Sequence, residues 1–162
     1  MMDSVDQTMA KVENAGGIYI GGTSLSSEAT VRDDLAEYLA LQKSSSSVTN
    51  VALFSKAIPV KLGTYAIMIR MKVSDITKTE KMISVQVRKG TELGALIKEW
   101  LISPSMFEVN NKYKVIGSIV EFGEIKGTKM NISASLIKTS ATEKVTIDYI
   151  LVNPAYTSIS AV

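Results

Sequence analysis

The sequence AIMIRMKV, residues 66–73, decides the predicted fold. Its side chains alternate between two faces, with Ile67, Ile69, Met71 and Val73 on one and Met68, Arg70, Lys72 and Ser74 on the other. A period of two residues is typical of a β-strand with one buried and one solvated face. The same pattern returns at Ile83, Val85 and Val87, after a polar turn at residues 77–81. These two segments are therefore expected to pair as a hairpin.

The downstream sequence continues as short strands separated by turn-forming residues. In residues 112–122, the expected core face carries Tyr113, Val115, Gly117 and Ile119. After a glycine-containing turn at residues 123–127, the next alternating set is Met130, Ile132, Ala134 and Leu136. These two segments predict a second hairpin. Residues 145–152 are expected to form a last strand, ended by Asn153 and Pro154 because proline cannot continue the hydrogen-bond ladder.

The N-terminal third of the chain has a different period. One helical face carries Val31, Leu35, Tyr38 and Leu39. Ser26 or Ser27 can cap the first turn, since a serine hydroxyl satisfies an orphan amide there. An amphipathic helix is therefore predicted over residues 27–43.

The expected domain organisation follows from these patterns. Residues 1–25 form a flexible arm, in which Ile18–Ile20 fits either a strand or an ordered piece of the arm. Residues 26–47 hold the helix and a serine-rich linker, residues 48–155 the β-rich domain, and residues 156–162 a tail.

Composition excludes several classes of enzyme. The 162 residues include no cysteine and no histidine, which removes thiolate nucleophiles, imidazole acid–base chemistry and the usual zinc ligands. Asp33 and Asp34 cannot face each other as catalytic carboxylates, because adjacent helical residues point about 100° apart. We therefore expect no enzymatic activity, no cofactor and no metal.

Apolar segments and net charge indicate where the protein is located and what it binds, but less strongly than composition excludes enzyme classes. No stretch approaches the ~20 apolar residues of a membrane span, and residues 1–17 contain no apolar run of signal-peptide length. The protein is expected to be soluble and intracellular, or a viral component made inside a cell. A net charge of +2 is too small to indicate nucleic-acid affinity by itself, so any such site must come from local arrangement.

Two stretches together carry a family resemblance. They are VSDITKTEKMISVQVRKGTELGALIKEW (residues 73–100) and NKYKVIGSIVEFGEIKGTKMNISASLIK (residues 111–138). They resemble the core domain of the middle subunit of replication protein A and the single-domain subunits of telomere-capping CST-type complexes. Gly90-Thr91 matches the family's turn, Trp100 its strand-ending tryptophan and Phe122 its later aromatic residue.

The resemblance implies a mainly β fold, a five-stranded antiparallel barrel of the oligonucleotide-binding (OB) type, here preceded by the N-terminal amphipathic helix. It also favours a strand over a helix for residues 91–100, which fit either pattern. The sequence departs from the family at Arg88-Lys89, where acidic residues are usual, and at Val120, where a basic one is usual. The predicted helix has no counterpart in the family.

The implied function is non-catalytic binding of single-stranded nucleic acid within a larger complex, in the nucleus. A base stacked on an aromatic ring contributes ~1–3 kcal/mol, and Trp100 and Phe122 are the expected platforms. The expected cationic groove consists of Arg70, Lys72, Arg88, Lys98, Lys126 and Lys129. The same residues also fit structural roles, since tryptophan is mostly buried and cations are common on the solvated face of an antiparallel sheet.

The expected partners are a single nucleic-acid strand, with DNA favoured over RNA, and other protein subunits docking through residues 27–43. Two alternatives stay open. One is a self-assembling viral structural protein, since the order of elements also loosely resembles rhabdovirus matrix proteins. The other is a barrel without a ligand that acts as a protein–protein adaptor.

Overall fold

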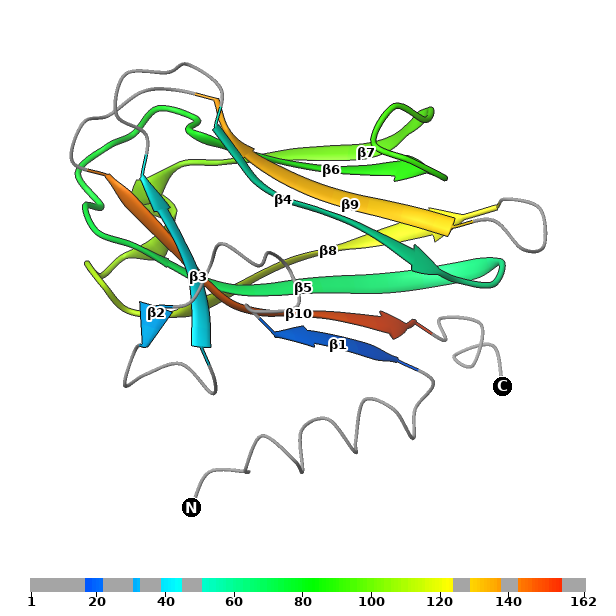
Figure 1. Cartoon of the computed structure of the whole chain (residues 1–162). Coiled ribbons are helices and arrows are strands. Elements are labelled where there is room, and N and C mark those ends of the chain that lie inside the picture. The colour runs from blue at the N-terminus through cyan, green and yellow to red at the C-terminus, as the bar shows by residue number, and fades with distance from the viewer. Residues whose placement is uncertain are drawn as a thin grey trace.

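The computed structural model describes residues 17–21, 31–32, 39–44, 51–123, 129–137 and 143–155, whose strands form two antiparallel sheets (Figure 1). The first sheet holds β1 (Ile18–Gly21), β2 (Val31–Arg32), β3 (Leu39–Ser44), β5 (Gly63–Val73), β8 (Lys114–Phe122) and β10 (Lys144–Pro154). The second holds β4 (Val51–Pro59), β6 (Ile83–Lys89), β7 (Leu96–Ile102) and β9 (Lys129–Leu136). A short 3₁₀ helix, η1 (Pro104–Phe107), lies between β7 and β8.

The first sheet is organised around β10. Its strand order is β2-β3-β10-β5-β8, with β1 also paired to β10. On the edge of β10 away from β5, β3 pairs with Lys144–Ile147 and β1 with Tyr149–Val152. The register of β10 against β5 shifts between Ile147 and Tyr149, which places a bulge where β3 gives way to β1. The second sheet has the simpler order β4-β9-β6-β7.

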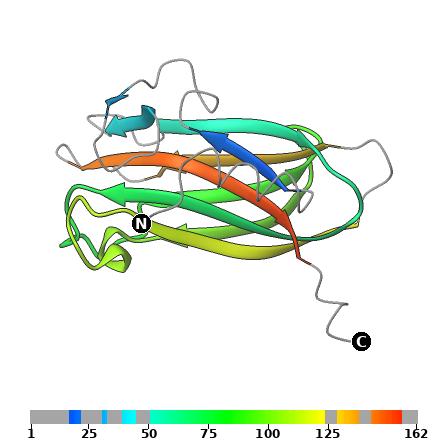
Figure 2. The ribbon, with the colours of Figure 1, turned by 90° about the horizontal axis from the view of Figure 1, so that it is seen from below.

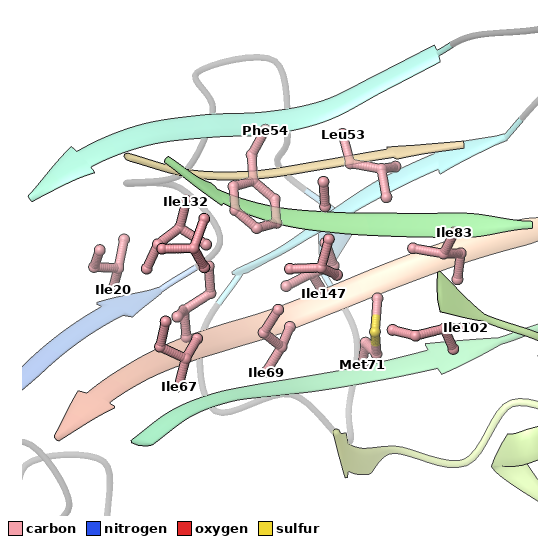
Figure 3. Close-up of a cluster of buried hydrophobic side chains, with 14 of the residues drawn as sticks. Ile20, Leu53, Phe54, Ile67, Ile69, Met71, Ile83, Ile102, Ile132 and Ile147 are labelled. Carbon is pink, nitrogen blue, oxygen red and sulfur yellow. The ribbon is translucent and has the colours of Figure 1, made fainter. Parts of the chain in front are cut away.

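The two sheets pack face to face over one apolar core (Figure 1). Seen from below, the first sheet lies in front of the second (Figure 2). The predicted inward residues of β5, Ile67, Ile69, Met71 and Val73, are fully buried. They meet Ile83, Val85 and Val87 of β6 and the alternate residues Met130, Ile132, Ala134 and Leu136 of β9, which are also buried as predicted. Figure 3 shows side chains from both sheets, such as Phe54 and Ile147, pointing into the same layer. The alternation therefore identified the core faces of these strands correctly.

The predicted OB barrel is wrong. Within the described ranges, no ladder of hydrogen bonds joins one sheet to the other, so the strands form an open two-layer sandwich. The edge strands β7 and β8 lie next to each other but pair only with β6 and β5, respectively. Side chains of the two inner faces fill the space that a barrel would close with backbone pairing.

Both predicted hairpins are wrong for the same reason. β5 pairs with β10 and β8, and β6 pairs with β7 and β9, so the polar segment between β5 and β6 crosses from one sheet to the other. The connection from β8 to β9 likewise joins different sheets. Alternation shows which residues share a face, but a hairpin and a crossing between sheets give the same pattern.

The predicted helix over residues 27–43 is also wrong where the structure describes the chain. Residues 31–32 and 39–44 are strands, and residues 27–30 and 33–38 lie outside the described residues. β3 pairs with the first part of β10, so the hydrogen-bonding groups of a sheet edge override the local helical pattern. The predicted arm and tail lie outside the described residues, except for residues 17–21, which contain β1.

The predicted core face of β8 is the opposite one. Val115 and Ile119 are 47% and 48% exposed, whereas Val120 and Phe122 are buried. The ladder places Val120 opposite Tyr65 and Ile116 opposite Ile69, so the even-numbered residues of β8 share the inward face of β5. Apolar residues occupy both faces of this edge strand, and the choice between the faces depends on a shift of one residue.

Candidate functional site

The outer face of the second sheet carries a patch of small polar side chains. The inward residues of β6 are Ile83, Val85 and Val87, so Ser84 and Gln86 point to the opposite side. In the ladders, Ser84 lies opposite Ser135, and Gln86 lies between Ser133 on β9 and Glu99 on β7. Three adjacent strands therefore bring these polar groups together.

These residues line a shallow hollow of about 230 Å³ on the sheet. Its lining consists of Ser84, Gln86, Glu99, Ser133, Ser135 and Ile137, and we call it the β6–β9 groove. At ~30 Å³ per water molecule, the volume corresponds to about seven or eight waters, roughly the space of one small polar ring. The groove is thus of a size for a small polar ligand or for one unit of a longer chain.

Hydrogen bonds fix the polar atoms of the groove. The Ser84 hydroxyl and the Gln86 amide nitrogen both donate to Glu99 Oε2, each at 2.7 Å. Arg88 donates to Gln86 Oε1 from Nε at 3.3 Å and from Nη2 at 3.0 Å, and its Nη1 donates to the Gly94 carbonyl at 2.9 Å. Arg88 therefore orients the Gln86 amide so that its nitrogen faces Glu99.

The carboxylate of Glu99 is kept ionised by this network. The hydrogen bond from Gln86, then that from Ser84, lowers its pKa below the ordinary value, and the charge of Arg88 adds to the effect. Glu99 is exposed, so its charge stays accessible from solvent. The groove therefore presents a permanent hydrogen-bond acceptor at neutral pH.

Other polar atoms of the groove have no hydrogen-bond partner among the described residues. Within the described part of the chain, the hydroxyls of Ser133 and Ser135 and the Oε1 atom of Glu99 make no hydrogen bond. A hydroxyl can both donate and accept, and a carboxylate oxygen accepts. Three groups on rigid strands are therefore available to a ligand that both donates and accepts.

The structure separates the two expected aromatic platforms. Phe122 is 1% exposed and belongs to the core, so its ring has no face open to a base. Trp100 lies opposite Val85, is partly buried against the core, and its Nε1 is buried with no hydrogen-bond partner in the described part of the chain. Neither ring lies in the β6–β9 groove.

The expected cationic groove is divided between two faces of the sandwich. Arg70 and Lys72 lie on the outer face of the first sheet, where Arg70 forms an ion pair with the buried Asp148. Their charged groups lie 4.3 Å and 4.9 Å from the ring centroid of Tyr113. Arg88 lies on the outer face of the second sheet, with the whole core between it and Arg70.

The remaining predicted cations are also dispersed. Lys98 is on β7, and its Nζ donates to the Ile119 carbonyl of β8 at 3.0 Å, which links the two edge strands. Lys129 is exposed at the start of β9. Lys126 lies outside the described residues. The structure therefore assembles no track of cations from this set.

The residues of this candidate site were missed by the sequence prediction. Ser84, Ser133 and Ser135 are the polar members of alternating strands, a pattern also produced by an ordinary solvated sheet face. Glu99 belongs to the segment that fitted either helix or strand. Alternation places Ser84, Ser133 and Ser135 on the polar faces of their strands. To predict that these residues lie together, one must also know that β6 pairs with both β7 and β9.

Metal ligands and membrane spans are not found in the described residues. No group of three or more acidic residues is placed to hold a metal ion in residues 51–123, 129–137 and 143–155 or the shorter described segments. In the same ranges, no helix is long and apolar enough to cross a membrane.

Comparison with known proteins shows the fold. By sequence, the chain matches no family model and no curated protein. By structure, it resembles the CBM36-1 domain of a multidomain xylanase from the hindgut metagenome of Trinervitermes trinervoides, with 13% identity, a TM-score of 0.54, and coverage of 86% of this chain and 98% of that one.

Two further structures extend the comparison. A CBM36 carbohydrate-binding module in complex with calcium and xylotriose has 14% identity and a TM-score of 0.52, over 84% of this chain and 99% of that one. The insecticidal delta-endotoxin Cry8Ea1 from Bacillus thuringiensis has 16% identity and a TM-score of 0.54, over 85% of this chain and 24% of that one. At these identities, the likeness establishes a shared β-sandwich.

These findings correct the expectations that rested on the OB resemblance. The structural relatives are sandwiches and include carbohydrate-binding modules, so the resemblance to replication protein A and CST-type subunits is wrong. The predictions of single-stranded nucleic-acid binding and of subunits docking through residues 27–43 are overturned with it, and a nuclear location finds no support. The matrix-type and adaptor alternatives also find no support among these structures.

Proposed function

We propose that the protein is a non-catalytic glycan-binding module whose ligand lies in the β6–β9 groove. The observation that carries the proposal is a set of groups, Ser133, Ser135 and Glu99 Oε1, that make no hydrogen bond within the described residues and surround a hollow the size of one sugar ring. Sugar hydroxyls both donate and accept hydrogen bonds, so they complement this set. Strands hold the groups in place, which limits the entropy lost on binding.

The fold adds support but does not carry the proposal alone. The sandwich is shared with a carbohydrate-binding module solved with xylotriose and also with an insecticidal toxin. A fold hosts many functions, and function resides in the site. The groove chemistry is what favours a glycan here.

Binding is favoured over hydrolysis by the number of carboxylates. Glycoside hydrolysis ordinarily uses two carboxyl groups flanking the bond, one of which must be protonated to act as an acid. Glu99 is the single carboxylate among the described residues that line the groove, and hydrogen bonds lower its pKa. A carboxyl group that stays ionised is a poor general acid at neutral pH.

The affinity is expected to be modest. No aromatic side chain of the described residues lines the groove, so hydrogen bonds supply most of the binding free energy. At about 1 kcal/mol net for each of four or so bonds, the Kd for a short oligosaccharide is on the order of 1 mM.

Titration calorimetry with xylotriose and cellotriose tests the proposal. Gln86→Ala removes the amide that positions Glu99, so we expect at least about fivefold weaker binding. Glu121→Ala is the control, because Glu121 is exposed on the outer face of the other sheet. Binding that Gln86→Ala leaves unchanged, or no binding at ~10 mM of either sugar, would refute the proposed site.

A further inference from the structure

The β6–β9 groove carries a negative charge. Glu99 is the one charged side chain among its described lining residues. Its Oε2 atom already accepts two hydrogen bonds, and Oε1 accepts none from the described residues. A ligand in the groove therefore meets an ionised oxygen that can still accept hydrogen bonds.

No cation is among the described lining residues, and the charge of Arg88 acts on Glu99 from outside the groove. The guanidinium of Arg88 is held by Gln86 Oε1 and the Gly94 carbonyl, and Arg88 is not among the lining residues. Lys98 comes directly before Glu99 on β7, and its Nζ donates to the Ile119 carbonyl on β8 of the other sheet. The neighbouring strand β9 contributes the hydroxyls of Ser133 and Ser135, and Ile137 directly after it completes the lining.

We propose that the groove selects neutral glycans and rejects glycans that carry carboxylate or sulfate groups, with Glu99 as the residue that discriminates. This inference rests on the proposed function and names the ligand class of the same site. A hydroxyl donates to Glu99 Oε1, whereas a second carboxylate offers no donor and repels it. The serines of β9 supply the matching donors and acceptors for neighbouring hydroxyls.

The expected size of the effect follows from the charges. Two unit charges about 4 Å apart in water interact strongly enough to change an affinity by about fivefold, and partial exclusion of water increases the factor. Because salt screens exposed charges, the selectivity should shrink as ionic strength rises.

A matched pair of ligands tests the inference. Cellotriose and the same trisaccharide oxidised to a carboxylate at C6 differ in charge but share the ring skeleton. We expect the wild-type protein to bind cellotriose at least about fivefold more tightly than the oxidised sugar at low salt. Glu99→Gln keeps an oxygen that can accept from Ser84 and Gln86, and it should reduce the ratio to about twofold or less.

The control is Glu121→Gln, which removes a carboxylate from the other sheet and should leave the ratio unchanged. If the wild-type protein binds both sugars equally, or if Glu99→Gln keeps the full discrimination, the inference fails while the proposed function stands. If neither sugar binds, both fail. Calorimetry at low and at high salt completes the test, since selectivity that is independent of salt would contradict an electrostatic origin.

Discussion

Glu143 is the residue whose burial has the clearest energetic consequence. It is 0% exposed, and Oε1 accepts from the Asp75 amide at 3.2 Å and from the Ser74 hydroxyl at 3.5 Å. Oε2 is buried and has no hydrogen-bond partner among the residues that the structure describes. Burial raises the pKa of Glu143, and the negative charge of Asp75 raises it further. The hydrogen bonds from the amides of Asp75 and Ser74 and from the Ser74 hydroxyl lower it, but they do not outweigh burial. The folded protein therefore holds this proton more tightly than the unfolded chain does.

The sign of the pH dependence follows from that raised pKa. The stabilising contribution is fully present below the ordinary pKa of 4.5 and is lost as pH rises through the higher folded value. Glu143→Gln cannot ionise, so we expect it to be more stable than the wild-type protein at about pH 7. The gain should shrink toward zero at about pH 4. Urea denaturation at the two pH values measures the difference.

Glu92→Gln is a suitable comparison, because Glu92 is exposed on the turn between β6 and β7. It should show no comparable change with pH. A Glu143→Gln protein that is less stable than wild type at neutral pH, or one whose gain is the same at both pH values, would contradict the described burial of the carboxylate.

At the scale of elements, the turn between β6 and β7 supports the groove through Arg88, which bonds to the Gly94 carbonyl and to Gln86. The Lys89 amide donates to the Ala95 carbonyl and the Gly94 amide to the Thr91 carbonyl, each at 2.9 Å. A Cβ atom at Gly94 would lie 1.7 Å from the Lys89 carbonyl oxygen. That oxygen belongs to the backbone, so the turn must open to accept any side chain at this position.

We expect Gly94→Ala to lower the free energy of unfolding by about 2–4 kcal/mol, because the clash forces a backbone shift. It should also weaken glycan binding, since the Gly94 carbonyl accepts from Arg88, which orients Gln86. Gly123→Ala is the matched control, because a Cβ there meets nothing within 4 Å. Chemical denaturation compares the two variants, and equal stabilities would show that the turn has another conformation.

The elements also show how far the sequence predicts this fold. The inward sets on β5, β6 and β9 follow from alternation, because burial on one face imposes a period of two residues on an extended chain. Strand pairing does not follow, since the segment between β5 and β6 has the polar composition of a hairpin turn and yet crosses between sheets. For β3, pairing with β10 decides the conformation, and this contact lies about 100 residues away in the sequence.

At the scale of the whole molecule, the sandwich brings the candidate site together. Glu99, Gln86 and Ser133 belong to three strands that are neighbours only because β6 pairs with both β7 and β9. The sequence predicts that Gln86 and Ser133 lie on polar faces, but it does not predict that these faces adjoin. The same architecture places Arg70 and Arg88 on opposite outer faces, which separates residues that a barrel was expected to unite.

The central claim is that a glycan binds to the outer face of the second sheet, and amide chemical-shift mapping by NMR tests it most directly. On titration with xylotriose, we expect the shifts to concentrate at Ser84, Gln86, Glu99, Ser133 and Ser135, which line the groove. Amides of the outer face of the first sheet, such as those of Arg70 and Val115, should stay unchanged. Shifts centred on that first sheet, or none at ~10 mM sugar, would contradict the account.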